Sequence, residues 1–265
     1  MSSPNIVLVT GGNNGLGYET VKALLESDKA YHVLLGSRSL DKARRAIGTL
    51  HSECPTATNT VEAVQLDLTS DESIEKASEH IKASLGRLDI LINNAGSTFD
   101  FEFLAGNVSL RECFTKAYDV NVAGTHVLTW TLIPLLLKSA DPRLIFVSGL
   151  SNLSQASREY FPTPPQPAGW PKTIEFETIG YRCSKVALNM LMLDWNHKLK
   201  ADGVKVWAVG PGMLATDLGN IREQSAAMGA QHPSVGGQVL RRVVEGEMDE
   251  YVGKFVGKDG LMDGF

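Results

Sequence analysis

Cysteine and basic residues are scarce in this sequence, and their scarcity excludes several kinds of protein. The three cysteines, Cys54, Cys113 and Cys183, are too few and too widely spaced for a disulfide framework or a metal site. Lysine and arginine number 25 against 30 acidic residues, which gives a net charge of −5, and they form no basic run. We therefore expect no nucleic-acid partner.

Long hydrophobic runs are also missing. The longest apolar-rich run, residues 127–137, contains two threonines and a proline and is too short to cross a bilayer. The early apolar run at residues 5–9 is short and has no basic residue before it, so we expect no secretory signal. These features favour a cytoplasmic protein that has no membrane partner.

The sequence does contain enough apolar residues for one large domain. Of its 265 residues, 43% are hydrophobic and 21% are charged, which suits a globular α/β domain. No linker rich in proline, glycine and serine separates two complete apolar patterns. We predict a single domain over residues 1–265.

A glycine-rich segment, Thr10–Gly17, lies between the first apolar run and a helical pattern that begins near Leu16. Its glycines, Gly11, Gly15 and Gly17, follow the spacing G-x-x-x-G-x-G rather than the G-x-G-x-x-G of large dehydrogenases. Glycines allow a tight turn, and the free N–H groups at a helix start attract anions. The segment therefore indicates a site for the phosphates of a dinucleotide. A strand-to-helix turn that binds no ligand is the alternative.

Apolar runs and helical patterns alternate along the rest of the chain. Strands are expected at about 5–9, 32–37, 61–66, 88–92, 143–147, 204–209 and 254–256, and helices at about 15–28, 40–52, 69–85, 109–137, 180–199 and 234–246. Thr69–Glu72 and Ser109–Glu112 have the spacing of capping boxes, and we expect the long helix to bend or end near Pro134. This alternation predicts an α/β fold with a doubly wound parallel sheet of about seven strands and helices on both faces.

Several polar or unusual residues fall where the expected strands end. Asp67, Asn93, Ser148 and Pro211 each follow an apolar run. Ligands of such sheets bind beyond the carboxyl ends of the strands, so these positions are candidates for a binding site. Ser148 at a strand end is equally compatible with an ordinary turn residue.

Tyr181 and Lys185 stand four residues apart in a helical pattern and so share one helix face. An ammonium about 4 Å from a phenol, at an effective dielectric constant near 20, contributes roughly 4 kcal/mol, or about three pKa units. We expect this to bring the pKa of Tyr181 from about 10 to about 7, where it can act as a general acid or base. An amphipathic surface helix is the alternative. Asn121 is unusual within an apolar helix and is either exposed or directed at a polar group.

Taken together, these residues resemble the short-chain dehydrogenase/reductase family in its compact, one-domain, carbonyl-reductase-like form. The resemblance covers nearly the whole chain, and its motifs occur in order. They are Thr10–Gly17, Asp67, Asn93-Asn94-Ala95-Gly96, Asn121, Ser148, Tyr181–Lys185 and Pro211-Gly212 with Thr216.

The resemblance implies a role for each of four catalytic candidates. Tyr181 would exchange a proton with the substrate's oxygen, and Ser148 would hydrogen-bond the same oxygen. Lys185 would lower the pKa of Tyr181 and bind the nicotinamide ribose. Asn121 would hold a water molecule that links Lys185 to bulk solvent.

The resemblance also implies a nicotinamide dinucleotide as cofactor. Asp67 would meet its adenine, Asn93 its adenosine ribose and Thr216 its carboxamide. The full set of expected cofactor-binding residues is Thr10, Gly11, Asn13, Asn14, Gly15, Leu16, Gly17, Ser37, Arg38, Asp67, Leu68, Asn93, Ala95, Gly96, Tyr181, Lys185, Pro211, Gly212, Leu214 and Thr216.

The end of the second strand favours NADPH/NADP+ over NADH. NAD sites usually carry an acidic residue there for the ribose 2′-hydroxyl, but here the segment is Gly36-Ser37-Arg38-Ser39. Arg38 can pair with a 2′-phosphate through two hydrogen bonds, and Ser37 adds a hydroxyl. A solvated arginine is the alternative.

The sequence departs from the family pattern at two places. Gly149 follows Ser148 where a serine is common, so Ser151 is a rival for the catalytic hydroxyl. The segment at about 150–178 is longer than in most members and carries Pro162, Pro164, Pro165, Pro167 and Pro171. It resembles the insert of monomeric carbonyl reductases that covers a helix used by other members for association. We expect a partly ordered flap over the active site and a monomer or dimer; a disordered surface loop is the alternative.

The expected reaction is NADPH-dependent reduction of a ketone or aldehyde to an alcohol, with Tyr181 as general acid. The expected pocket walls are the insert, the 97–107 loop and a substrate loop at about 213–233. Their aromatic and apolar residues suggest an apolar or aromatic substrate: Phe99, Phe101, Phe103, Phe161, Trp170, Met213 and Leu214. The alternative is a protein of this fold that binds NADP(H) without turnover, as a sensor or interaction module.

Overall fold

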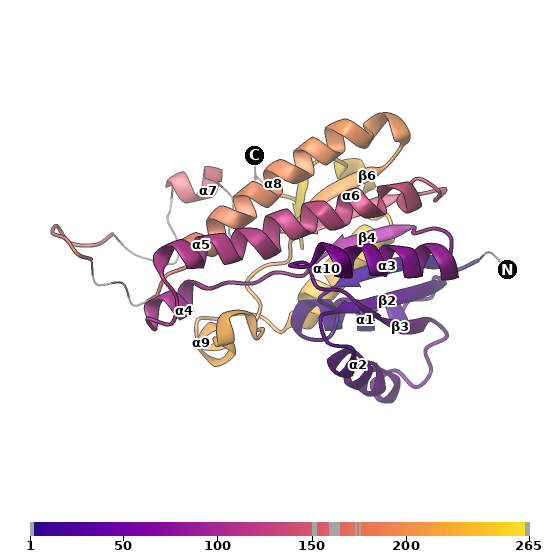
Figure 1. Ribbon diagram of the computed structural model, residues 1–265, viewed down its shortest axis with the longest axis horizontal. Helices are drawn as coiled ribbons and strands as arrows, with labels where there is room; N and C mark the ends of the chain where they lie inside the picture. The colour runs from indigo at the N-terminus through magenta and orange to yellow at the C-terminus, as the bar shows by residue number, and fades with distance from the viewer. Residues whose placement is uncertain (1–2, 150–152, 159–164, 173, 175, 263–265) are drawn as a thin grey trace.

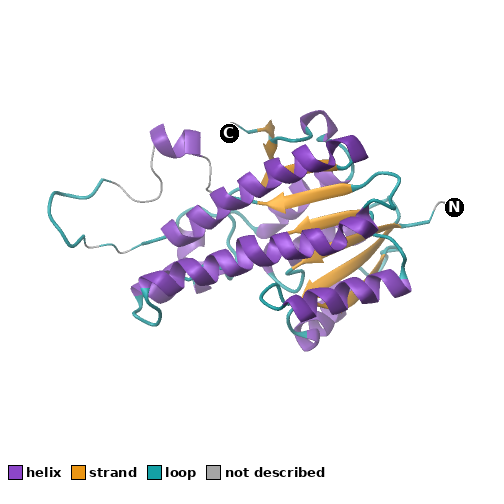
Figure 2. Cartoon of the chain, turned by 45° about the horizontal axis from the view of Figure 1, so that its top comes forward, coloured by secondary structure: helices purple, strands orange, loops and turns teal. Residues whose placement is uncertain are grey.

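The computed structural model describes residues 3–149, 153–158, 165–172, 174 and 176–262. Within these residues a sheet lies between two layers of helices (Figure 1 and Figure 2). This arrangement confirms the predicted doubly wound α/β fold.

The sheet has eight strands in the order β3-β2-β1-β4-β5-β6-β7-β8. All neighbours are parallel except β7 and β8, which are antiparallel. The strands are β1 (Asn5–Thr10), β2 (Tyr31–Ser37), β3 (Thr60–Gln65), β4 (Ile90–Asn93), β5 (Arg143–Val147), β6 (Lys205–Gly210), β7 (Phe255–Gly257) and β8 (Gly260–Leu261). β8 is a two-residue addition to the expected seven.

The described helices occupy both faces of the sheet and the loops at its carboxyl edge. The longer helices are α1 (Gly15–Leu25), α2 (Leu40–Glu53), α3 (Asp71–Ser84), α5 (Leu110–Tyr118), α6 (Thr125–Leu136), α8 (Ile179–Leu199) and α10 (Pro233–Val244). The short ones, none of them predicted, are α4 (Asp100–Leu104), α7 (Leu153–Arg158) and α9 (Arg222–Ala227).

Side chains along each strand point alternately to the two faces of the sheet, so a hydrophobic core forms on each face. Leu8 belongs to the core under α3, α6 and α8, whereas Val7 and Val9 belong to the core under α1, α2 and α10. Successive strand side chains point to opposite faces, so each central strand contributes to both cores. Because helices cover both faces, the carboxyl edge is where the sheet remains accessible to a ligand.

The predicted helix over 109–137 is interrupted, and the interruption does not lie at Pro134. Residues Asp119–Gly124 form a π-helical segment between α5 and α6, while Pro134 lies within α6. Because α6 ends at Leu136, the predicted end of the helix near Pro134 is confirmed, whereas the π-helical interruption was not predicted. At Gly124 the segment lies so close to Leu68 that a Cβ atom would overlap the Leu68 carbonyl oxygen. The predicted capping box at Ser109 is confirmed.

The other predicted capping box, Thr69–Glu72, is wrong by one residue. The N-cap of α3 is Ser70, whose hydroxyl accepts a hydrogen bond from the N–H of Ser73. The Thr69 hydroxyl instead donates to Asp67 at 2.8 Å. A serine beside a threonine offers two possible caps, and the competing carboxylate of Asp67 decides between them.

The described part of the proline-rich insert does not lie over the carboxyl edge of the sheet. Residues 165–171 are exposed, Trp170 at 85%, and their trace runs away from the body of the molecule (Figure 1). No described residue between 153 and 178 lines the cavity at that edge. The predicted flap is therefore wrong for these residues, while Ser151 and Phe161 lie outside the described ones.

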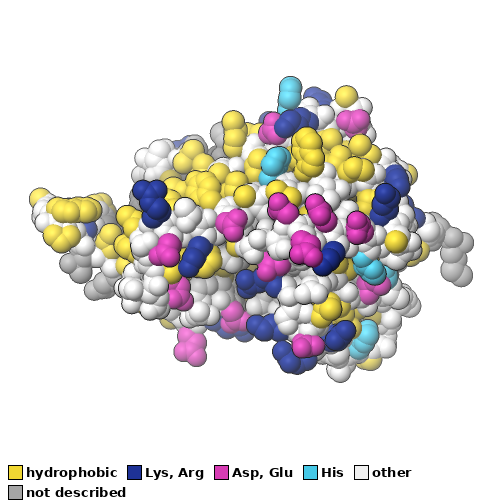
Figure 3. All heavy atoms as spheres, viewed as in Figure 1, with side chains coloured by type: hydrophobic (Ala, Val, Ile, Leu, Met, Phe, Trp, Pro, Cys, Tyr) yellow, Lys and Arg dark blue, Asp and Glu magenta, His cyan; other side chains and the backbone are white. Residues whose placement is uncertain are grey.

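Hydrophobic side chains gather on the surface formed by α6 and α8 (Figure 3). Trp130 on α6 is 65% exposed and Met190 on α8 is 68% exposed. The described part of the insert leaves both side chains open. Among the described residues, no helix combines the length and hydropathy that a membrane span requires.

We predict that Gly124→Ala destabilises the protein by about 2–4 kcal/mol, because the added methyl group displaces the backbone at Leu68. The control is Gly48→Ala in α2, where an added Cβ meets nothing within 4 Å. That variant should be up to about 1 kcal/mol more stable, since alanine is the better helix former. Urea denaturation of both variants checks this, and equal stabilities would contradict it.

Candidate active site

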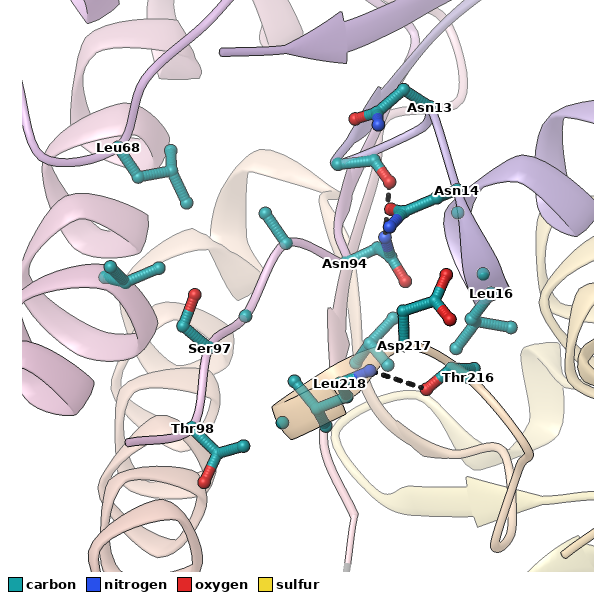
Figure 4. A pocket seen from close by; sticks show the side chains of 18 of the residues that line it. Asn13, Asn14, Leu16, Leu68, Asn94, Ser97, Thr98, Thr216, Asp217 and Leu218 are labelled. Carbon is teal, nitrogen blue, oxygen red and sulfur yellow. Dashed lines mark hydrogen bonds between the residues drawn. The ribbon is translucent and has the colours of Figure 1, made fainter. Parts of the chain in front are cut away.

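A cavity of about 580 Å³ opens at the carboxyl edge of the sheet. Figure 4 shows that Asn13, Asn14 and Leu16 of the glycine turn lie on one side of it and Ser97 and Thr98 on the other. Most of the predicted site residues line it: Gly11, Asn13, Asn14, Gly15, Leu16, Gly17, Ser37, Arg38, Asp67, Leu68, Ala95, Gly96, Ser148, Tyr181, Lys185, Pro211, Gly212, Leu214 and Thr216. Thr10, Asn93 and Asn121 do not.

The glycine turn has the geometry of an anion site. Gly11 and Gly15 have φ of +65° and +53°, values that favour glycine, and a Cβ on Gly17 would overlap the Gly11 carbonyl oxygen. Asn14 is the N-cap of α1 but forms no side-chain cap, and no acidic residue occupies the first turn. The first N–H groups of α1 therefore keep their positive potential toward the cavity, which fits a pyrophosphate.

Thr10, which lies outside the cavity, and Asn94, which lines it, hold this turn in place. The Thr10 hydroxyl oxygen accepts hydrogen bonds from the N–H groups of Asn94 and Ala95 at 2.9 and 2.8 Å. The Asn94 side chain donates to the Thr10 carbonyl at 2.7 Å. Thr10 is thus a support for the turn, and Asn94 is a cavity residue that the sequence analysis missed.

Asn93 points in the opposite direction from Asn94. Its side-chain amide donates to the hydroxyl of Thr129 on α6 at 3.0 Å, and the residue is buried. A contact between the Asn93 side chain and a cofactor ribose is not compatible with this orientation. The Asn93-Asn94 pair indicates that one asparagine faces the cavity. Because the two neighbours are identical, the sequence does not reveal which of them it is.

The far end of the cavity, beyond β2 and β3, is basic. Arg38 is joined there by Lys42, in the first turn of α2, and by Ser37 and Ser39. Asp67 and Leu68 form the facing wall after β3. Lys42 was missed, because Arg38 lies before the N-cap of α2 and the i, i+4 rule therefore does not pair the two residues.

The catalytic candidates meet at the middle of the cavity. Tyr181 and Lys185 lie on one face of α8, with the Lys185 Nζ 5.6 Å from the centre of the Tyr181 ring. Ser148 follows β5 on the same cavity wall, and the Lys185 ammonium donates to the Val147 carbonyl at 2.8 Å. The fold thus brings Ser148 to the Tyr181–Lys185 pair, from which it is far removed in the sequence.

The pKa values of this pair differ from the sequence-based expectation. Burial raises the pKa of Tyr181 above its ordinary value of 10, and burial lowers the pKa of Lys185 from 10.5 to about 8. The predicted lowering of the tyrosine pKa to about 7 is therefore wrong for the protein without its cofactor. The expectation counted only the attraction between the two charges, whereas both groups also lose their hydration.

Asn121 lies in the π-helical segment, fully buried, with its side chain directed at polar groups. Its Oδ1 accepts from the Ser97 N–H at 2.8 Å, and its Nδ2 donates to the Ser97 carbonyl and to the Ser184 hydroxyl. A Cβ on Gly96 would lie 3.3 Å from both Asn121 Oδ1 and Lys185 Nζ, so the two residues flank Gly96. Its predicted role in a water relay stays a prediction.

The substrate end of the cavity is built by two segments that the sequence analysis treated as loops. Phe99 and Phe101 line it as predicted, whereas Phe103 and Met213 do not. The Phe101 ring packs against Phe176 at 5.3 Å between centroids. Further lining residues confirm the predicted walls at 97–107 and 213–233 and come from α4, the segment before it and a 3₁₀ turn after β6: Ser97, Thr98, Glu102, Asp217, Leu218, Gly219 and Asn220.

Comparisons with known proteins agree with this geometry. The profile of the short chain dehydrogenase family matches residues 5–161. The chain is also 44% identical over 268 residues to the short-chain dehydrogenase/reductase tropE of Talaromyces stipitatus, which covers all of this chain and 99% of that protein. The chain belongs to the short-chain dehydrogenase/reductase family.

Other members and structures extend the likeness. The short-chain dehydrogenase/reductase eupG of a Phoma species is 41% identical over 255 residues, which cover 92% of this chain and 91% of that protein. The NADPH-bound carbonyl reductase from chicken fatty liver has the same fold, with a TM-score of 0.77 at 23% identity over 98% of this chain and 99% of that one. This chain is thus an oxidoreductase of a family that uses NAD(P)H, as the sequence resemblance predicted.

We predict that Lys185→Met is more stable than the wild type at pH 7 although it loses activity. The pKa of Lys185 is about 10.5 when unfolded and about 8 when folded. At pH 7 the charged form therefore costs the folded state about 3 kcal/mol. Between pH 8 and 10.5 the unfolded state binds more protons, so wild-type stability rises with pH and the difference shrinks. Urea denaturation at pH 7 and pH 10 measures this, and a pH-independent difference would contradict it.

Proposed function

We propose that this protein is an NADPH-dependent reductase that converts an apolar or aromatic ketone or aldehyde to its alcohol. One observation carries the proposal. A single cavity joins an anion-binding glycine turn, a basic end at Arg38 and Lys42, and Tyr181 beside the buried Ser148 and Lys185. The residues therefore fit a dinucleotide that extends from the basic end to the tyrosine.

The electrostatics of the site suit reduction. When bound, the cofactor supplies the hydride that is transferred to the carbonyl carbon. Burial raises the pKa of Tyr181, so its phenol keeps the proton that must be delivered to the carbonyl oxygen. The Ser148 hydroxyl hydrogen-bonds and orients the same oxygen. Lys185, with a pKa of about 8, is mostly protonated at pH 7 and binds the ribose hydroxyls.

The preference for NADPH rests on charge. Arg38 and Lys42 offer two cations at the basic end of the cavity, and no acidic residue occurs in the Gly36–Ser39 segment. A 2′-phosphate would pair with the planar Arg38 guanidinium through two hydrogen bonds, with Ser37 and Ser39 adding hydroxyls.

The preference for an apolar or aromatic substrate rests on Phe99 and Phe101, which form part of the wall beyond the catalytic residues. Aromatic rings favour flat apolar ligands through stacked or edge-to-face contacts.

We also propose that the protein is a monomer or dimer, and light scattering that shows a tetramer would overturn this.

We expect the wild type to oxidise NADPH in the presence of aromatic aldehydes, ketones or quinones. Tyr181→Phe removes the proton donor and should lower kcat by roughly 10²–10⁴-fold. Its NADPH affinity, followed by fluorescence titration, should stay close to that of the wild type. Wild-type NADPH binding without turnover of any carbonyl would overturn the proposed function and favour a non-catalytic sensor.

The cofactor assignment has its own test. Side-by-side fluorescence titrations should show tighter binding of NADPH than of NADH to the wild type. Arg38→Asp places a carboxylate at the phosphate site and should reverse the preference, because it repels a 2′-phosphate and accepts from a 2′-hydroxyl. Arg44→Asp on α2, outside the cavity, is the matched control and should leave the preference unchanged. An unchanged preference in Arg38→Asp would remove the assignment.

A further inference from the structure

A buried carboxylate contacts the backbone of the proposed general acid. Asp100, the first residue of α4, has an exposed fraction of 0%. Its carboxylate accepts hydrogen bonds from the Gly180 N–H at 2.7 Å and from the Tyr181 N–H at 2.9 Å. It also accepts one from the Thr98 hydroxyl at 2.8 Å. An acidic side chain 81 positions away thus holds the start of the helix that carries Tyr181.

The start of α8 depends on two carboxylates. Its N-cap, Thr178, makes no side-chain cap. Instead, the Glu177 carboxylate accepts from the N–H groups of Thr178 and Ile179 at 2.7 and 2.8 Å, and Asp100 accepts from the next two. The four N–H groups that a helix start leaves unpaired are therefore all satisfied, and the negative charges oppose the positive end of the helix.

Tyr181 is held on both sides of its Cα atom. Asp100 takes its N–H, and the Ser184 hydroxyl donates to its carbonyl at 2.6 Å while accepting from Asn121. Gly180 permits the close approach, because a Cβ there would lie 3.0 Å from both Asp100 Oδ1 and Cys113 Sγ. The backbone of Tyr181 has little freedom to move relative to the cavity.

We propose that Asp100 is a positioning residue for the reaction, which sets the place of the Tyr181 phenol by hydrogen-bonding the backbone of Tyr181 and Gly180. Its orientation comes from Thr98, which lines the substrate end of the cavity. The wall that contacts substrate and the helix that carries the proton donor are thereby fixed to each other. This inference rests on the proposed function, since it assigns Asp100 a part in that reaction.

Asp100→Asn tests the inference, because an amide keeps the shape but has one oxygen for two N–H donors. Misplacing a catalytic group by about 1 Å can cost a rate factor of about 10², so we expect kcat to fall by roughly ten-fold or more. The Kd for NADPH should stay within about two-fold of the wild type, because Asp100 does not line the cavity. The isotope effect from C4-deuterated NADPH should rise, since the chemical step becomes slower.

The matched control is Glu177→Gln, which removes the other carboxylate from the same helix start without touching Tyr181. We expect its kcat to stay within about two-fold of the wild type. Equal losses of kcat in both variants would overturn the inference in favour of a general effect of charge on α8. Wild-type kcat and isotope effect in Asp100→Asn, with lowered stability alone, would reduce Asp100 to a structural cap.

If Asp100→Asn does not fold, Thr98→Val replaces it, since that change removes only the hydroxyl that orients the carboxylate. We expect a smaller fall in kcat with a raised isotope effect, and wild-type values of both would overturn the inference. The activity of the wild type distinguishes a failure of the proposed function from a failure of this inference. A wild type that turns over no carbonyl overturns both proposals, whereas an active wild type with an equally active Asp100→Asn overturns this one alone.

Discussion

Hydrogen bonds from the segment that follows β4 hold the cavity together. Asn94 fixes the glycine turn through Thr10, Ser97 binds both ends of the Asn121 amide, and Asp100 caps α8. Each of these contacts joins two elements that are far apart in the sequence. The segment therefore aligns the glycine turn, the π-helical segment and Tyr181 with one another.

Burial gives the site its chemistry at the expense of stability. Taking Tyr181 and Lys185 out of water keeps the phenol protonated and lowers the pKa of the ammonium toward neutrality. The same desolvation makes the charged lysine unfavourable in the folded protein, and the Val147 carbonyl offsets part of that cost. A loss of stability from buried charged groups is common at active sites, where the packing of the surrounding core compensates for it.

The sequence alone predicts the parts of this protein that depend on local patterns. The glycine turn needs glycines at Gly11 and Gly15 for left-handed backbone, and the Tyr181–Lys185 spacing needs only a helix, so both can be read from residue order. The π-helical segment has no such signature, and the close packing of Gly124 on Leu68 within it joins residues that are far apart in the sequence. Asp100 was hidden for the same reason, since its partners Gly180 and Tyr181 are neighbours only after folding. The direction of the tyrosine pKa shift likewise depends on burial, which spacing does not report.

The antiparallel strand β8 affects whether other copies of the chain can add a strand to this sheet. A parallel sheet exposes unpaired backbone at its edges, and such edges promote aggregation by adding strands from other chains. Here one edge ends in a two-residue strand, too short to pair extensively with a neighbour. At the opposite edge, β3 carries Glu62 within 4 Å of His32 and His80, so a strand added there would have to desolvate polar side chains. Both edges of the described sheet therefore disfavour the addition of strands from other chains.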